Sequence, residues 1–393
     1  MKKTHRNRIQ SLVLAITLGA GLGLVSPASA QFTSVQSTSA QEYYFSSQVA
    51  QKYYYIVDFN SKTVTDLGIL GGNNSSATGI NNAGQVVAGD PDSLTGVDEA
   101  FITGPHGAGR TTIGVGWMGY AYGINAAGQV VGNSRTATGD QHAFITGSNG
   151  VGMTDLGTLR GGTESYAYGV NNAGQVVGNS DTAAGVQHAF VTGSNGVGMT
   201  DLGTLGGANS SAYGINAAGQ VVGNSDTVAG VQHAFITGPN GVGLTDLGTL
   251  GGASSFATGI NDAGQVVGYS DTAAGLHHAF ITGSNGVGMT DLGTLGGSYS
   301  FAYGINDAGQ VVGYSDTAAV LRHAFVTGPN GVGMTDLNLL MSLPGVSGTE
   351  ATAINNLGQA VVVTGLVPEP ETYALLLAGL GLIGVMARRS KPA

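Results

Sequence analysis

The sequence predicts an all-β chain whose body is a seven-bladed β-propeller, and three observations carry this prediction. The phrase Ala-Tyr-Gly-Ile-Asn-x-Ala-Gly-Gln-Val-Val-Gly recurs about seven times, at spacings of 44 to 49 residues. Each copy holds four short apolar runs, and the chain begins and ends on complementary halves of one copy. A period near 45 built from short strands is typical of propellers and other repeat arrays. The Gly-Gln pair marks the copies at Gly84, Gly128, Gly174, Gly219, Gly264, Gly309 and, in degenerate form, Gly358.

Each repeat unit contains four strand-like runs. In the unit that covers residues 200–244, run d is Thr200–Gly203, run a is Tyr213–Asn216, run b is Gln220–Gly223 and run c is Ala234–Gly238. Asn-Gly and Ala-Gly pairs between the runs favour tight turns, because they permit positive φ at low cost. No run is long enough for a helix. Since a lone four-stranded sheet is only marginally stable, we expect the units to stack as blades.

The two ends of the repeat array complement each other. Residues 53–59 stand where run c would precede the first run d, and residues 353–363 repeat runs a and b with no c and d after them. The two halves together make one blade, which brings the total to seven. Closing the ring in this way hides the strand edges that an open array would expose. The alternative is an open β-repeat solenoid, which needs no complementary ends.

Composition excludes several classes of protein. The 393 residues include no Cys and 69 Gly, so disulfides and thiolate chemistry are absent and tight turns are frequent. Between residues 31 and 367 there are six basic residues against 21 acidic ones, a net formal charge of −15. A body of this charge is repelled by phosphate backbones, so we expect no nucleic-acid partner.

The N-terminus has the three parts of a secretory signal peptide. Four basic residues precede an apolar run over residues 12–25, and Ala28 and Ala30 form an Ala-x-Ala site. We therefore expect residues 1–30 to be a signal peptide cleaved after Ala30. A linker rich in Ser, Gln and Thr follows over residues 31–50 and leads into the propeller, predicted over residues 51–366.

The C-terminus has the parts of a second targeting signal. Val367, Pro368, Glu369 and Pro370 are followed by an apolar segment, predicted as a membrane helix over residues 373–387, and by a basic tail that includes Arg388 and Arg389. Residues 367–393 thus resemble the PEP-CTERM sorting signal of Gram-negative bacteria. The resemblance implies that the helix holds the protein in the inner membrane until an exosortase-type enzyme cuts near Pro-Glu-Pro. The product would then reach the cell surface or an exopolysaccharide matrix. The basic tail fits a cytoplasmic end.

The body resembles the extracellular HAF-repeat family. The resemblance rests on His-Ala-Phe triplets that recur in phase with the Gly-Gln pair, while Glu99-Ala100-Phe101 is an atypical first copy. It implies an exported β-repeat protein and no known reaction. The triplets begin at His142, His188, His233, His278 and His323.

Repetition argues against assigning chemistry to the repeated polar residues. Equivalent histidines on different blades lie too far apart to share a metal, so we expect each to make a structural hydrogen bond. The nearest predicted acceptors are aspartates of the preceding loop, namely Asp181, Asp226, Asp271 and Asp316. The Ser-Asp-Thr loops and Asp90-Pro91-Asp92 could supply oxygen ligands for Ca²⁺, but turns favour the same residues without a metal. We expect no metal, no cofactor and no catalytic residue.

Departures from the repeat are the better candidates for a site. Trp117, the only tryptophan, lies in the degenerate second unit near Arg110, and this pair is the predicted ligand rim. Arg135, Arg160 and Arg322 break the repeat singly. The sequence therefore predicts a non-catalytic surface or matrix scaffold that binds exopolysaccharide or a surface protein through one rim. The alternative is a secreted hydrolase acting on glycans at the centre of the ring.

Overall fold

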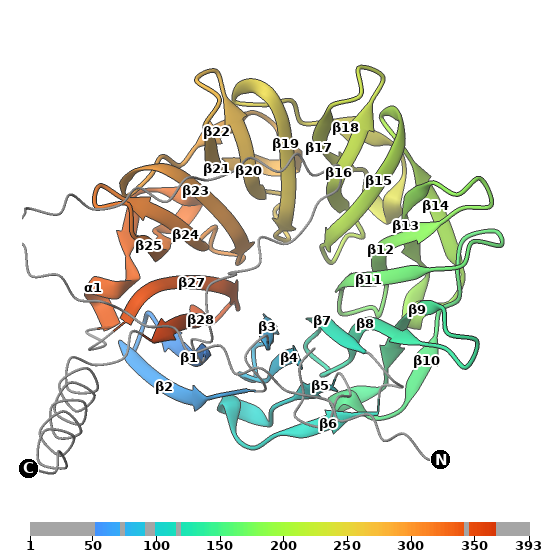
Figure 1. Cartoon of the computed structure of the whole chain (residues 1–393), viewed down its shortest axis with the longest axis horizontal. Coiled ribbons are helices and arrows are strands. Elements are labelled where there is room, and N and C mark those ends of the chain that lie inside the picture. Colours follow the sequence, from blue (N-terminus) through green and yellow to red (C-terminus); the bar gives the residue numbers. More distant parts are fainter. Residues whose placement is uncertain (1–51, 71–74, 91–98, 115–118, 342–345, 367–393) are drawn as a thin grey trace, which may run out of the picture. The chain divides into compact units, whose positions relative to one another are not determined.

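The computed structural model describes residues 52–70, 75–90, 99–114, 119–341 and 346–366, and these form a ring of seven four-stranded antiparallel sheets (Figure 1). The strand that carries run a lies nearest the centre of each blade, and the strand that carries run d lies at the periphery (Figure 1). The seven-bladed propeller predicted from the repeat is therefore confirmed. The helices within the described ranges lack the length and apolar character that crossing a bilayer requires.

Six blades are built from four consecutive strands, ordered from the inner to the outer edge. The first three of these blades comprise β3 (Ser76–Ile80), β4 (Val86–Asp90), β5 (Glu99–Ile102) and β6 (Thr111–Ile113); β7 (Tyr120–Ile124), β8 (Val130–Arg135), β9 (Gln141–Thr146) and β10 (Met153–Asp155); and β11 (Ser165–Val170), β12 (Val176–Asp181), β13 (Gln187–Thr192) and β14 (Met199–Gly203). The next three comprise β15 (Gly206–Ile215), β16 (Val221–Thr227), β17 (Gln232–Thr237) and β18 (Leu244–Asp246); β19 (Gly251–Ile260), β20 (Val266–Thr272), β21 (His277–Thr282) and β22 (Met289–Asp291); and β23 (Gly296–Ile305), β24 (Val311–Thr317), β25 (Arg322–Thr327) and β26 (Met334–Asp336).

The seventh blade closes the ring with strands from both ends of the chain. Its order is β2 (Thr63–Gly68), β1 (Lys52–Asp58), β28 (Gln359–Leu366) and β27 (Val346–Ile354). β1 and β28 pair in antiparallel register, with Ile56 opposite Val361. The predicted strand exchange is therefore correct, and the open solenoid is wrong. Closure leaves no inner edge strand without a neighbouring blade.

Short helical turns complete the described chain. Single 3-10 turns link runs c and d in six blades, and α1 (Leu337–Met341) follows β26 where the repeat's Thr-Asp-Leu-Gly becomes Thr-Asp-Leu-Asn. The 3-10 turns are η1 (Pro105–Gly107), η2 (Ser148–Gly150), η3 (Ser194–Gly196), η4 (Pro239–Gly241), η5 (Ser284–Gly286) and η6 (Pro329–Gly331).

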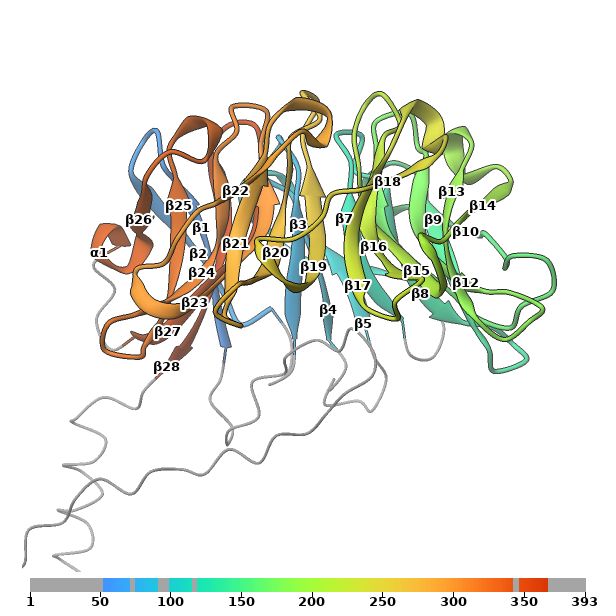
Figure 2. The ribbon, with the colours of Figure 1, turned by 90° about the horizontal axis from the view of Figure 1, so that it is seen from above.

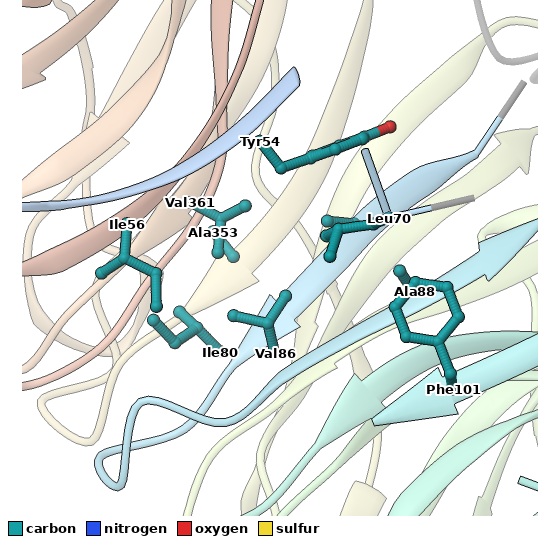
Figure 3. Close-up of a cluster of buried hydrophobic side chains, with 10 residues drawn as sticks. Tyr54, Ile56, Leu70, Ile80, Val86, Ala88, Phe101, Ala353 and Val361 are labelled. Carbon is teal, nitrogen blue, oxygen red and sulfur yellow. The ribbon is translucent and has the colours of Figure 1, made fainter. Parts of the chain in front are cut away.

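The hydrophobic core is divided among the seven interfaces between blades. In one of them, Val177 and Ala189 of one blade pack on Val221 and Phe235 of the next, and all four are fully buried. Burying a phenylalanine side chain contributes roughly 1.5–3 kcal/mol, and the repeat supplies one at each of six interfaces. Figure 3 shows the interface beside the closing strands, where Tyr54 and Ile56 of β1 face residues of β3 and β4.

Glycine lets the inner strands approach closely. An added Cβ on Gly223 of β16 would lie 1.9 Å from the carbonyl oxygen of Ser211 on β15. A side chain there would force the two strands apart, which explains why run b reads Val-Val-Gly in most copies.

A closed ring of asparagines joins the blades near their inner ends. The asparagine that ends run a is buried in every blade, and its Nδ2 donates to the backbone carbonyl of the equivalent asparagine in the next blade. The last of these bonds, from Asn355 to Asn81, spans 2.9 Å and completes the circle. The other six run from Asn81 to Asn125, Asn125 to Asn171, Asn171 to Asn216, Asn216 to Asn261, Asn261 to Asn306 and Asn306 to Asn355.

The ring has two different faces (Figure 2). The face that carries these asparagines also carries the loops between runs c and d. The opposite face, here called the terminal face, carries the loops between runs b and c and the described chain ends at Lys52 and Leu366. In another blade Asp226 and Gln232 pair at the two ends of the b–c loop, and Gly365 and Lys52 pair at the same position in the closing blade. The two chain ends therefore take the place of one b–c loop.

Candidate functional site

The five histidines of the His-Ala-Phe triplets each contact a carboxylate within their own blade. In one blade the Nδ1 of His188 lies 2.9 Å from Oδ2 of Asp201, while Oδ1 of Asp201 accepts a hydrogen bond from the backbone of Gly203 at 2.8 Å. The predicted structural hydrogen bond is present, but the predicted acceptors in the preceding loop are wrong. The observed acceptors belong to the Thr-Asp-Leu motif of run d, at Asp155, Asp201, Asp246, Asp291 and Asp336.

The antiparallel pairing of runs c and d explains this partner. Phe190 stands opposite Asp201, so the side chain two residues earlier lies on the same face and reaches Asp201 diagonally. The aspartate thus joins run c to the turn after run d. The chain repeats this carboxylate six times, and this contact gives it a structural role at the end of the strand.

The predicted rim residue Arg110 is engaged inside its own blade. Its guanidinium lies 2.8 Å from a carboxylate oxygen of Glu99 and donates to the carbonyl of Leu70 at 3.1 Å. The same group sits 4.2 Å from the ring centroid of Phe101, which is fully buried. Glu99 occupies the histidine position of the atypical triplet, so Arg110 replaces the missing His–Asp contact. Its predicted partner Trp117 lies outside the described residues.

The residues of the predicted signal peptide and of the C-terminal sorting signal also lie outside the described ranges. This applies to the cleavage-site residues Ala28 and Ala30 and to the sorting residues Val367, Pro368, Glu369, Pro370, Arg388 and Arg389.

One departure from seven-fold likeness is a chain of aromatic rings across two blades. Phe256 of β19 stacks on Tyr269 of β20, with ring centroids 4.8 Å apart. Tyr269 contacts Phe301 of the next blade, again at 4.8 Å, and Phe301 stacks on Tyr314 of β24 at 4.9 Å. We call these four rings, together with His277 and Tyr299, the aromatic cluster.

An ion pair extends the aromatic cluster to a third blade. The guanidinium of Arg322, on β25, lies 4.0 Å from the ring centroid of Tyr314. It donates to Oε1 of Glu350, on β27 of the closing blade, at 2.7 Å. Burial opposes the charged form of Arg322, but Tyr314 and Glu350 outweigh it and raise its pKa above the ordinary value. The pair therefore stays ionised and fixes the end of the ring stack.

Burial and neighbouring charge act on the tyrosines and the acid beside this pair. Burial raises the pKa of Tyr314, and Arg322 only partly opposes the shift. The pKa of Tyr303, whose ring lies 5.7 Å from that of Tyr314, is raised well above the ordinary value, chiefly by burial. Burial also raises the pKa of Asp316. Both phenols therefore remain neutral donors at physiological pH.

The aromatic cluster reaches the surface on the terminal face. His277 and Arg322 are the first residues of β21 and β25, at the same level as the chain end Lys52 on β1. Tyr299 is 39% exposed and the His277 side chain 36% exposed, whereas Tyr314 is buried. The most exposed members of the cluster are thus Tyr299 and His277, which lie beside the buried rings of Phe301 and Tyr314.

At least one other interface has small polar groups at the same positions. At one equivalent interface Nδ2 of Asn179 donates to Ser211 Oγ at 3.0 Å and to Gln187 Oε1 at 3.3 Å. Asn179 corresponds to Tyr269, and Ser211 corresponds to Phe301. Aromatic residues are therefore not required for blade packing at these positions.

Metal ligands do not converge in the described ranges. No group of three or more His, Asp or Glu side chains there is arranged to hold an ion. Of the loop carboxylates, Asp271 instead contacts His277, with Oδ1 and Nδ1 2.6 Å apart.

Comparison with known proteins adds one sequence signal. Residues 366–390 match the PEP-CTERM protein-sorting motif. The motif implies export and membrane-associated processing in Gram-negative bacteria, and exosortases recognise it. No curated protein matches the chain. The HAF-repeat resemblance therefore stays a prediction.

Solved structures share the fold at low identity. The chain is similar to one of two prolyl endopeptidases, with a TM-score of 0.52 and 10% identity over 70% of this chain and 44% of that one. It is also similar to the β-propeller domain of the trilobed protease from Pyrococcus furiosus, with a TM-score of 0.49 and 12% identity over 70% and 85% of the two chains. For TolB from Acinetobacter baumannii the TM-score is 0.41, with 11% identity over 60% and 62%. Of these three structures only the prolyl endopeptidase has a TM-score above 0.5, and at 10% identity its likeness concerns the fold alone.

Proposed function

We propose that this exported propeller is a non-catalytic surface or matrix protein that binds uncharged polysaccharide through the aromatic cluster on its terminal face. The observation that carries the proposal is the series of ring contacts from Phe256 to Tyr314, which ends at the Arg322–Glu350 pair. It combines aromatic rings of two successive blades with an ion pair to the third, the closing blade.

The chemistry of the aromatic cluster suits sugar rings. Aromatic side chains offer flat apolar faces at low conformational cost, and tyrosine adds a polar edge. A pyranose has an apolar face that stacks on such rings and hydroxyl groups at its rim. The charged groups of Arg322 and Glu350 would donate to and accept from those hydroxyls. A polysaccharide would place successive sugar units against side chains of neighbouring blades.

Charge selects the class of polymer. The body carries a net formal charge of −15, so a polyanionic chain would meet repulsion at low ionic strength. The arginine beside the aromatic cluster, Arg322, is already neutralised by Glu350. An uncharged polysaccharide avoids this repulsion.

The repeat itself supplies variants that test the proposal. Tyr269→Asn and Phe301→Ser install the residues that Asn179 and Ser211 provide in another blade, so the fold is expected to persist. With a soluble form spanning residues 31–366, affinity electrophoresis in dextran and related uncharged glucans should show binding. We expect the double variant to lose at least tenfold in affinity, about 1.4 kcal/mol. Tyr166→Ser, at the position of Phe301 in another blade, is the matched control and should bind normally.

The same experiment judges the alternatives. Equal binding by the double variant would overturn the aromatic cluster as the site. Tight binding of a uronic-acid polymer but not of a glucan would overturn the polymer class. Release of shortened glucan would favour the secreted hydrolase over a scaffold.

A further inference from the structure

The proposed binding site lies on the face of the ring where β28 ends and the sorting motif begins. Glu350, at one end of the aromatic cluster, pairs directly with Val363 on β28. Three residues later β28 ends at Leu366, where the sorting motif begins. β28 is an interior strand held by β1 on one side and β27 on the other. The tail therefore leaves from a fixed point in the blade that carries Glu350.

Covalent geometry limits how far the ring can stand from a membrane. Only six residues, 367–372, separate Leu366 from the apolar segment that begins at Tyr373. Whatever their conformation, six residues reach at most about 22 Å. The headgroup layer takes up roughly 6 Å of that on one side of a bilayer. The attachment point on the terminal face then stays within about 16 Å of the lipid surface.

Tilting the ring does not free the aromatic cluster. A rigid disc tethered at one blade lifts its far side most, and the blades next to the tether lift least. The aromatic cluster occupies the two blades that precede the closing blade in the ring, β19–β22 and β23–β26 (Figure 1). It therefore stays near the lipid in any orientation that keeps the terminal face toward the membrane.

We infer that membrane anchorage and polysaccharide binding exclude each other in this protein. While residues 373–387 are inserted, the aromatic cluster faces the bilayer at a distance that hinders a long polymer. Cleavage near Pro-Glu-Pro releases the ring and makes the cluster accessible. This inference rests on the proposed function and adds regulation to it, since processing would convert a silent precursor into a binding protein.

A spacer separates the two states without altering the ring. The full chain is placed in nanodiscs of phosphatidylethanolamine and phosphatidylglycerol, with or without 20 Gly/Ser residues inserted between Leu366 and Val367. A flexible linker of that length adds about 25 Å of reach. The matched control carries the same insert between Ala50 and Gln51, where it leaves the tether length unchanged. High-molecular-mass dextran and a short gluco-oligosaccharide are the two probes.

We expect the spacer to change the affinity for the long polymer and not the affinity for the short oligosaccharide. The tether-spacer protein should bind dextran at least tenfold more tightly than the unmodified and control proteins, while all three bind the oligosaccharide alike. Equal dextran binding by all three would overturn the inference and leave the proposed function intact. Failure of all three, and of the soluble form, to bind either probe would remove the proposed function, and the inference with it.

Discussion

Removing one asparagine of the inner ring should destabilise the whole propeller, and Asn355 offers the clearest case. Its side chain is 4% exposed and makes four hydrogen bonds. Nδ2 donates to the carbonyl of Asn81 at 2.9 Å and to Oε1 of Gln359 at 2.8 Å. Oδ1 accepts from the backbone amides of Leu357 and Gln359, both at 3.0 Å. Asn355→Ala removes all four.

The magnitude follows from these bonds. Each buried hydrogen bond contributes a net 0.5–1.5 kcal/mol, so the four together contribute about 4 kcal/mol. The turn lies at the end of the strands, where water can satisfy part of what is lost. We therefore expect Asn355→Ala to lower the free energy of unfolding by about 2–4 kcal/mol. Asn216→Ala should cost a similar amount, because the repeat gives it equivalent bonds.

Urea unfolding followed by far-ultraviolet circular dichroism measures the effect. The matched control is Asn356→Ala, one residue further on, at a position where alanine occurs naturally in two other blades as Ala126 and Ala217. The control should lie within about 1 kcal/mol of the parent. A loss below about 1 kcal/mol for Asn355→Ala, or a loss equal to that of the control, would show that the asparagine ring does not hold the blades together.

Two further predictions concern single residues. Val320 has φ = 60° and is 83% exposed, at a loop position where four other blades have glycine. Val320→Gly should therefore stabilise the protein by about 0.5–1 kcal/mol in the same urea assay, and Gly275→Val should destabilise it. The opposite order would contradict the strain argument. Burial raises the pKa of Asp58, but hydrogen bonds from Ser61, Gln359 and Asn60 outweigh burial and hold the pKa below 3.8. The ionised carboxylate therefore stabilises the fold at pH values above 3.8. This stabilisation is lost as the pH falls through the lowered pKa. Asp58→Asn should therefore flatten the loss of stability between pH 5 and pH 3, and an unchanged slope would refute the assignment.

The fold was predictable because the same pattern of four strands recurs in successive repeat units. Four runs per unit, a period near 45 and complementary ends leave few arrangements other than a closed ring. The pairing of Ile56 with Val361 follows from those ends without any knowledge of side-chain contacts. Repetition fixes the strand count even where one copy is degenerate, as at residues 111–113 of β6.

The contacts between strands were less predictable. The acceptor for His188 was expected in the preceding loop, yet it is Asp201, which lies 13 residues further along the chain. The pairing register of runs c and d decides this, and a bulge between Ala189 and Phe190 shifts that register by one residue. A one-residue shift moves a side chain to the other face of a sheet, so sequence spacing alone could not identify the acceptor.

The candidate site was missed for a related reason. The change from Asn-Ser-Asp to Tyr-Ser-Asp at Tyr269 and Tyr314 is visible in the aligned repeats, as is the single Arg322. What the sequence does not contain is the register between neighbouring blades, which sets Tyr269 against Phe301. Arg110 and Trp117 were predicted as a site because the chain has a single tryptophan. Arg110 instead completes the packing of an atypical blade.

A ring of near-identical blades also restricts where function can arise. A residue that most or all copies share is retained by a contact that those blades need, as the asparagine ring and the five His–Asp contacts illustrate. A binding site requires an asymmetric surface, and only blades that depart from the repeat together provide one. Here the two blades that carry the aromatic cluster are followed by the closing blade. Arg322 contacts Glu350 across the interface with that blade. Glu350 in turn pairs with β28, the strand that leads into the sorting motif. The exchange that closes the fold thus places the proposed site beside the segment that determines the protein's destination, which makes a link between processing and binding physically possible.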